Sequence, residues 1–229
     1  MSKFSLQLKK INTETSTTNS LVFAVSENVI FSAGQYLNIS IPDFASHSKA
    51  YTIASIPSDK DIVLTVKKQG TFSSALLNLQ IGAEVIAEGP EGYFFENFSA
   101  TKPTVFIAGG IGITPFMSII RQQVKSDTDL NKLMVMYSNK TKADIVFYDE
   151  LEKIKSENKI KQVINFLTQE NVTGFESGRI NVEAIKKQVA DYKNQNYYLC
   201  GSIGFVNSMW KMIGDLGVSE ESIFTEAFF

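Results

Sequence analysis

Strand-like and helix-like segments alternate from Thr104 to the end of the chain, and this alternation limits the choice of fold more than any other feature. Each short apolar run is followed by a longer segment in which apolar residues recur with helical spacing. Parallel strands need crossover connections of this kind, so the pattern predicts a parallel sheet with helices on both faces. In chain order the segments are TVFIAG, PFMSIIRQQVKS, KLMVMYS, VFYDELEKIKSEN, KQVINFL, NVEAIKKQVADYKN, NYYLCG, FVNSMWKMIGDLG and SIFTEAF.

The chain up to Gly92 has a different pattern of short apolar runs separated by turn residues, which predicts an antiparallel β-barrel. These runs are FSLQLKKI, SLVFAVS, QYLNISI, AYTIAS, DIVLTVKK and AEVIAEG. One helical segment, TFSSALLNLQ, interrupts them, and we expect Leu76, Leu77 and Leu79 to form its buried stripe. We therefore predict two domains, residues 1–98 and residues 103–229, joined by a short polar stretch.

Charge and the scarcity of cysteine and histidine exclude several classes of protein. With 22 basic and 24 acidic residues the net charge is −2, so we expect no nucleic-acid partner. We find no signal peptide and no apolar segment long enough to cross a bilayer, so we expect a cytoplasmic protein without a membrane partner. The single Cys200 and the single His47 exclude an internal disulfide, a four-cysteine iron–sulfur cluster and a zinc site. Redox chemistry would therefore need an organic cofactor, and we assign His47 no role.

The loop AGGIGITPF follows the first predicted parallel strand. Its glycines, at 109, 110 and 112, allow a sharp turn and a close approach to a ligand, while Thr114 can cap the next helix and Pro115 suits its first position. A helix N-terminus at this edge of a sheet favours an anionic dinucleotide. A tight turn without a ligand explains the glycines equally well. The later segment YYLCGSIGFVNSMW repeats the plan of strand, small-residue turn and helix, and two such ends can form one crevice.

Eight stretches in the same order resemble the ferredoxin–NADP reductase superfamily over nearly the whole chain: GQYL, KAYTIAS, GTFS, GPEGYF, AGGIGITP, YSNKTKADI, LCGS and TEAFF. The resemblance implies a flavin-binding barrel followed by a Rossmann-like domain that binds a nicotinamide dinucleotide. Its implied catalytic residues are Thr52, Cys200 and Glu226. Its implied cofactor-binding residues are Lys49, Tyr51, Thr52, Gly70, Phe72, Ser73, Gly109, Gly110, Gly112, Thr114, Pro115, Ser138, Asn139, Gly201 and Phe228.

In the barrel, the resemblance implies that Tyr51 packs its ring on the flavin and that Thr52 offers a hydroxyl to the reactive edge. The family has arginine where this chain has Lys49, and lysine binds phosphate without the planar fork of a guanidinium. Ser73 and the helix that follows would contact the flavin pyrophosphate, which favours tightly held FAD. Without the family, Ser73 is interpreted as a helix cap, and both roles are compatible.

In the second domain, the resemblance implies that Thr114 and Cys200 lie where flavin and nicotinamide meet. Cys200 would position the nicotinamide and would not act as a nucleophile; a small buried apolar residue is an equal alternative. Glu226 matches the family's C-terminal acid. Phe228 or Phe229 would cover the flavin ring until nicotinamide binds, and packing in the core is at least as good an explanation for one of them.

The predicted function is an FAD-dependent oxidoreductase that takes a hydride from NADH or NADPH and passes electrons to a diffusible acceptor such as a ferredoxin, a cytochrome or an oxygenase. The stretch YSNKTKADIVFYDEL offers Ser138, Lys140 and Lys142 but no arginine to a 2′-phosphate, which favours NADH slightly; these charges also suit a solvated helix start. The alternatives are a flavin reductase that releases reduced flavin, suggested by the terminal EAFF, and a non-catalytic dinucleotide-binding module.

Overall fold

A computed structural model describes the chain except residues 1, 26–28, 43, 45–47, 158 and 229, so the expectations for His47 and Phe229 lie outside the described residues. The chain divides into two compact units. The first comprises Met1–Glu96 with Thr114–Gln122, and the second comprises Asn97–Ile113 with Gln123–Phe229. Among the residues that the structure describes, no helix combines the length and the apolar character needed to cross a bilayer.

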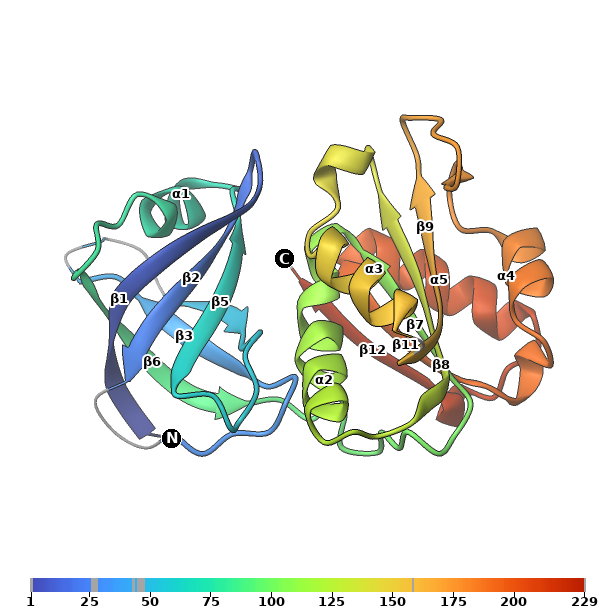
Figure 1. Cartoon of the computed structure of the whole chain (residues 1–229), viewed down its shortest axis with the longest axis horizontal. Helices are drawn as coiled ribbons and strands as arrows, with labels where there is room; N and C mark the ends of the chain where they lie inside the picture. The colour runs from blue at the N-terminus through green and yellow to red at the C-terminus, as the bar shows by residue number, and fades with distance from the viewer. Residues whose placement is uncertain (1, 26–28, 43, 45–47, 158, 229) are drawn as a thin grey trace. The chain divides into compact units, whose positions relative to one another are not determined.

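The first unit contains six antiparallel strands (Figure 1): β1 Ser2–Thr15, β2 Thr18–Val25, β3 Tyr36–Ser40, β4 Lys49–Thr52, β5 Asp61–Lys67 and β6 Glu84–Glu91. Their order in the sheet is β4-β3-β6-β1-β2-β5. An antiparallel bridge between Ile53, just after β4, and Leu64 of β5 joins the two ends of this order and closes the barrel. The predicted antiparallel barrel is confirmed.

The barrel core follows from side-chain alternation along its strands. Phe4, Leu6 and Leu8 of β1 are buried at every second position, and they pack in one cluster with residues from the other strands. The helix α1, Thr71–Leu77, covers this cluster, with Leu76 fully buried and Leu77 partly buried. The interrupting helix begins where the spacing predicts it but ends at Leu77, so Leu79 packs against the cluster from outside the helix.

Part of a helix that follows the glycine loop packs with the barrel. This helix, α2, spans Thr114–Lys125. The Ser118 hydroxyl is fully buried, accepts a hydrogen bond from the Gly34 N–H at 3.1 Å and donates one to the Ser55 carbonyl at 2.9 Å. Arg121 donates from Nη1 to the Ala54 carbonyl at 2.6 Å. Residues 114–122 thus supply polar contacts that satisfy barrel backbone groups.

The second unit contains a six-stranded parallel sheet, as predicted: β7 Thr104–Gly109, β8 Leu130–Asn139, β9 Ile160–Leu167, β10 Glu176–Ser177, β11 Asn196–Ser202 and β12 Ile223–Phe228. Helix α3, Tyr148–Ser156, packs on β9, while α4, Val182–Gln188, and α5, Ile203–Asp215, cover the opposite face (Figure 1). Short 3₁₀ turns are η1 Gly110–Ile113, η2 Lys142–Asp144, η3 Tyr192–Asn194 and η4 Glu220–Ser222.

The strand order β10-β9-β8-β7-β11-β12 reverses its direction of growth between β7 and β11. The chain adds β8, β9 and β10 on one side of β7 and then crosses to add β11 and β12 on the other. At such a switch point the connections leave neighbouring strands in opposite directions, so their carboxyl ends border a crevice in which open α/β sheets bind ligands. Gly109 ends β7 there, beside Gly201 near the end of β11.

One predicted helix is shorter than its pattern. The segment NVEAIKKQVADYKN forms α4 only as far as Gln188, and a separate 3₁₀ turn follows at Tyr192–Asn194. Val189 adopts extended geometry and is buried in the sheet's core, and Asp191 has a left-handed backbone. Burial of a β-branched residue outside the helix overrides the helical spacing at this point.

Candidate functional site

In the first unit, the structure brings together two of the stretches predicted to bind flavin. Tyr51 lies on β4 and is half-buried, and its ring stacks on Phe72 of α1 with centroids 6.3 Å apart and planes inclined by 22°. Burial raises the pKa of Tyr51 to about 12, so the phenol stays neutral at physiological pH. Phe44, which the sequence did not single out, packs edge-on against Phe72 at 5.6 Å. An aromatic platform therefore stands beside the exposed Lys49.

The start of α1 corrects the interpretation of Ser73 as a helix cap. The cap position belongs to Gly70, and Ser73 is the third helical residue. Its hydroxyl reaches back to accept hydrogen bonds from the N–H groups of Gln69 at 2.8 Å and Gly70 at 3.1 Å. Ser73 thus fixes the loop before the helix. Gly70 has no heavy atom within 4 Å of the position a Cβ would take, so its outer side leaves room for a ligand.

Two further family stretches meet through one side chain. Gln35, from GQYL, accepts a hydrogen bond from the Ser32 N–H at 2.8 Å and donates one to the Gly92 carbonyl, in GPEGYF, at 3.2 Å. Thr52, one strand away, is buried at the end of β4, and its neighbour Ile53 donates its N–H to the Gln35 carbonyl at 2.8 Å. Gln35 and its neighbours therefore hold the loop and the strand that carry the predicted flavin contacts.

In the second unit, the glycine loop differs from the predicted helix start. The turn η1 begins at Gly110, directly after β7, and runs without a break into α2. Thr114 is accordingly the first residue of α2, buried, and is not its cap, and Pro115 is the second. The helical segment therefore begins earlier than expected, at Gly110, because a 3₁₀ turn precedes the α-helix. The Tyr137 hydroxyl donates to the Gly110 carbonyl at 3.0 Å.

The glycines at the switch point are needed for contacts within the protein. A Cβ on Gly112 would collide with the backbone carbonyl of Cys200. A Cβ on Gly109 would lie 2.9 Å from the Phe205 ring, and one on Gly201 would lie 2.8 Å from the same ring. The loop after β7 and the end of β11 are therefore in direct contact, so the two predicted strand ends lie next to each other. No sequence pattern indicates a role for Phe205, because its contact with Gly109 joins residues far apart in the sequence.

Cys200 and Glu226 are neighbours across β11 and β12. Burial raises the pKa of the Cys200 thiol well above its ordinary value, Glu226 acts in the same direction, and the Gly201 backbone N–H acts against them. The thiol stays neutral, which agrees with a positioning role and not with a nucleophile. Burial also raises the pKa of Glu226 to about 7, and its Oε2 has no hydrogen-bond partner among the described residues. Its carboxyl group can therefore hold or release a proton near neutral pH.

Phe228 lies at the end of β12, where it is the register partner of Ser202 and is half-buried. Strand pairing up to this residue fixes its backbone. Its predicted role as a cover for the flavin remains a prediction.

The end of β8 carries Ser138, half-buried, and Asn139, which is 5% exposed. The Asn139 carbonyl accepts hydrogen bonds from the N–H and hydroxyl of Thr168. Its side-chain Nδ2 is buried and meets no acceptor in the part of the chain that the structure describes. A buried amide donor without a partner is costly, so an acceptor oxygen of a bound dinucleotide fits this position.

Two carboxylates follow Asn139. Asp144 accepts hydrogen bonds from the Thr141 N–H at 3.1 Å and hydroxyl at 2.7 Å, and Glu170 accepts one from the Lys142 N–H at 2.7 Å. The Lys142 ammonium lies 5.3 Å from the ring centroid of Tyr148 and 5.6 Å from that of Phe175, and these two rings stack on each other. A cation in this place is already stabilised by aromatic faces.

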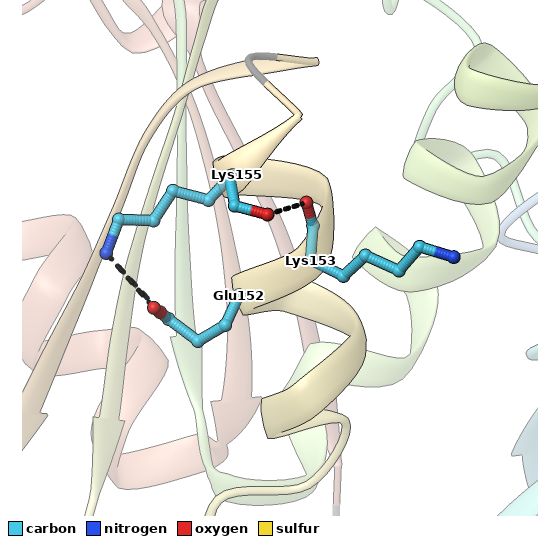
Figure 2. Close-up of polar contacts among 4 residues, drawn as sticks. Glu152, Lys153 and Lys155 are labelled. Carbon is cyan, nitrogen blue, oxygen red and sulfur yellow. Dashed lines mark hydrogen bonds and ion pairs between the residues drawn. The ribbon is translucent and has the colours of Figure 1, made fainter.

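The charges further along α3 contact each other. Lys155 lies 3.4 Å from Glu152, and the Ser156 hydroxyl donates to the Lys153 carbonyl at 2.8 Å (Figure 2). Lys153 also lies 3.9 Å from Glu157, one turn on. Exposed pairs of this kind contribute little to stability or binding. This part of the charged run is therefore a solvated helix face.

Other surfaces of the second unit are separate from these residues. A hollow of about 600 Å³ runs along α5 and is lined by Asn207, Trp210, Lys211, Gly214, Asp215, Val218 and Glu220, none of which belongs to the predicted site. In the described part of the chain, no group of three or more histidine, cysteine, aspartate or glutamate side chains is placed to hold a metal ion.

Comparison with known proteins assigns each unit to a family. Residues 5–95 match the oxidoreductase FAD-binding domain, and residues 106–211 match the oxidoreductase NAD-binding domain. The flavohemoprotein of Bacillus subtilis is 30% identical over 207 residues, which cover 86% of this chain and 51% of the relative. The NADH-cytochrome b5 reductase 1 of Lodderomyces elongisporus is 30% identical over 194 residues, which cover 80% of this chain and 64% of the relative. The chain thus spans about half to two thirds of the length of these relatives.

Among solved structures, a ferredoxin NADP⁺ reductase from Neisseria gonorrhoeae with bound FAD and NADP superposes with a TM-score of 0.87. The alignment covers 100% of both chains at 17% sequence identity, so it demonstrates a common fold.

Proposed function

Since the chain belongs to the ferredoxin–NADP reductase superfamily and is an FAD-dependent NAD(P)H oxidoreductase, we propose that it oxidises NADH and passes the electrons to a separate acceptor. The observation that carries this proposal is the meeting of the β7 and β11 ends, where Gly112 lies against the Cys200 carbonyl at the switch point of the sheet. FAD supplies the step from two-electron to one-electron transfer that such a reductase needs.

The barrel residues fit a flavin. The Tyr51 ring, backed by Phe72, offers a flat apolar surface, and the exposed Lys49 offers a positive charge to a phosphate. Gly70 leaves open space where a side chain would otherwise stand. Thr52, at the end of the same strand as Tyr51, contributes the hydroxyl next to the ring.

The residues of the second unit fit a dinucleotide that crosses the carboxyl ends of three strands. Asn139, at the end of β8, donates its unpartnered amide to an oxygen of the adenosine half. Cys200, at the end of β11, packs against the nicotinamide as a neutral group. Glu226 holds a proton close to that place at pH values below about 7 and exchanges it with solvent or with a reacting group.

The preference for NADH rests on two carboxylates, Asp144 after β8 and Glu170 after β9. Both are hydrogen-bonded to backbone or hydroxyl groups of residues 141–142, which we propose to lie beside the adenosine ribose. A carboxylate accepts a hydrogen bond from a ribose 2′-hydroxyl and repels a 2′-phosphate. The Lys142 ammonium lies against the rings of Tyr148 and Phe175. The balance of charge at this point therefore favours NADH.

The acceptor is proposed from chemistry and from the names of the relatives. One relative is named a flavohemoprotein, and the other is named a reductase of cytochrome b5. We infer a one-electron acceptor, a cytochrome, ferredoxin or oxygenase component, that is separate from the residues described here.

An absorbance spectrum of the purified chain, recorded anaerobically before and after NADH and then NADPH, tests the proposal. A flavin band that is retained through gel filtration and bleaches with NADH at a higher kcat/KM than with NADPH is the expected result. A colourless protein that reduces added flavin would indicate the flavin reductase instead. A flavin band that neither nucleotide bleaches would contradict both and leave dinucleotide binding alone.

A further inference from the structure

The side chain of Phe205 occupies the switch point of the parallel sheet. Phe205 lies in the first turn of α5 and donates its N–H to the Ser202 hydroxyl at 3.4 Å. One side of its ring is pressed against the backbone of two strands, because the Cβ positions of Gly109 and Gly201 would lie 2.9 Å and 2.8 Å from ring atoms. The side chain as a whole is only half-buried, so another part of the ring remains accessible.

The two glycines locate the ring with respect to the sheet. Gly109 ends β7, and Gly201 is the next-to-last residue of β11. A Cβ on Gly201 would also lie 3.3 Å from the Gly109 carbonyl, so the strand ends are in contact with each other as well as with the ring. The ring therefore spans the boundary between the two strands at the edge where a ligand of this fold binds.

We propose that Phe205 is a positioning residue for the nicotinamide riboside half of the dinucleotide, which packs on the accessible side of its ring. This inference rests on the proposed function. The adenosine half is assigned to the end of β8, through Asn139 and Glu170, and β7 lies between β8 and β11 in the sheet. A dinucleotide extended along this edge brings its other half to β11, where Phe205 provides a flat apolar surface.

A role in core packing alone makes a different prediction. Phe205 also contacts the cluster that includes Val206 and Met209. If packing were its whole function, truncation would lower stability and leave the affinity of the folded protein for every nucleotide unchanged. Affinities for the two halves of the cofactor therefore separate the two roles.

The test compares wild type, Phe205→Ala, Phe205→Tyr and the control Ile203→Ala in the full chain with its flavin. Ile203 lies in the same turn of α5, is 45% exposed and is not among the atoms nearest to either glycine. Dissociation constants for NAD⁺ and for AMP are measured by calorimetry, together with KM and kcat for NADH. For Phe205→Ala we expect NAD⁺ affinity to fall about tenfold, AMP affinity to change less than about twofold, and KM to rise more than kcat falls. Phe205→Tyr keeps the ring and should restore NAD⁺ affinity, and Ile203→Ala should match wild type.

Equal NAD⁺ affinity in wild type and a folded Phe205→Ala variant would overturn the inference while leaving the proposed function standing. Equal losses of NAD⁺ and AMP affinity would also overturn it, because they indicate a general disturbance of the crevice. A wild-type protein that binds neither nucleotide would sink the proposed function itself. If Phe205→Ala fails to fold, Phe205→Leu removes the ring but keeps most of the apolar volume, and the same comparison of NAD⁺ with AMP affinity decides.

Discussion

Cys200 and Glu226 stand side by side as register partners on β11 and β12, and burial raises the pKa of both side chains. The thiol therefore stays neutral at physiological pH, while Glu226 is neutral below about pH 7 and ionises above it. A neutral pair avoids placing a thiolate beside a carboxylate in a buried position. The proposed nicotinamide site therefore contains an acid, Glu226, whose charge depends on pH in the neutral range.

The elevated pKa of Glu226 makes stability depend on pH. In the folded state this pKa rises from 4.5 to about 7, so between these values the folded protein binds more protons than the unfolded chain. The stabilising contribution is complete below pH 4.5 and is lost as pH rises through about 7. Between pH 5 and pH 8, wild type should lose about 2–3 kcal/mol more unfolding free energy than Glu226→Gln. Urea unfolding at both pH values measures this difference, and parallel curves for the two proteins would contradict it.

Alanine at position 112 should destabilise the second unit. Its Cβ would meet the Cys200 carbonyl, a backbone group that cannot rotate away. We expect Gly112→Ala to lower the unfolding free energy by about 1–3 kcal/mol in thermal or urea unfolding. Gly214, in α5, has nothing within 4 Å of its Cβ position, so Gly214→Ala should be neutral or stabilising by up to about 1 kcal/mol. Equal effects of the two changes would refute the contact.

Removal of the Tyr51 ring should weaken flavin retention. The ring stacks on Phe72 and forms the accessible part of the aromatic platform in the barrel. Tyr51→Ala should cost on the order of 1–3 kcal/mol of FAD binding, measured by equilibrium dialysis or by the flavin retained on gel filtration. Tyr51→Phe keeps the ring and should retain FAD. Tyr93→Ala, at a tyrosine that is 81% exposed, is the matched control. Full flavin occupancy in Tyr51→Ala would argue against the assigned site.

The Ser118 hydroxyl should matter for the stability of the first unit. It is fully buried and bonded to the backbone of Gly34 and Ser55. Ser118→Ala leaves a buried N–H and a buried carbonyl without this partner, at a cost of about 1–3 kcal/mol in unfolding free energy. Ser208, exposed on α5, provides the control Ser208→Ala, which should unfold like wild type. An unchanged urea midpoint for Ser118→Ala would show that the hydroxyl is dispensable.

Neutralising Glu170 should relax the choice of nucleotide. Its carboxylate accepts the Lys142 N–H at 2.7 Å, next to the proposed ribose site. Glu170→Gln removes one negative charge near a 2′-phosphate, so the ratio of kcat/KM for NADPH to that for NADH should rise about fivefold. Glu183→Gln, an exposed change on α4, should leave the ratio unchanged. If both variants keep the wild-type ratio, the NADH preference has another origin.

The elements were predictable because their signals are local. Alternate burial of Phe4, Leu6 and Leu8 marks a strand in the sequence itself, and the unbroken apolar run of Thr104–Gly109 marks a strand buried on both faces. Where burial competed with spacing, as at Val189, the predicted helix was too long.

Contacts between distant residues were not predictable in the same way. The stacking of Tyr51 on Phe72, the hydrogen bonds of Ser73 and the position of Phe205 against Gly109 and Gly201 depend on how separate elements meet. The glycine spacing indicated a close approach, but the groups that approach, the Cys200 carbonyl and the Phe205 ring, are identified only by the folded structure. Asn139 was named from the family, while its unpartnered amide needed the packed structure.

The membership of residues 114–122 in the first unit affects the order in which a nascent chain acquires structure. Translation delivers all six barrel strands before it delivers Ser118 and Arg121, whose side chains satisfy barrel carbonyl and N–H groups. On the ribosome the barrel therefore completes its own contacts only after β7 and the glycine loop have also emerged. In a fragment released after the sixth strand, the backbone groups of Gly34, Ala54 and Ser55 would lack these partners and would have to bind water or a chaperone instead.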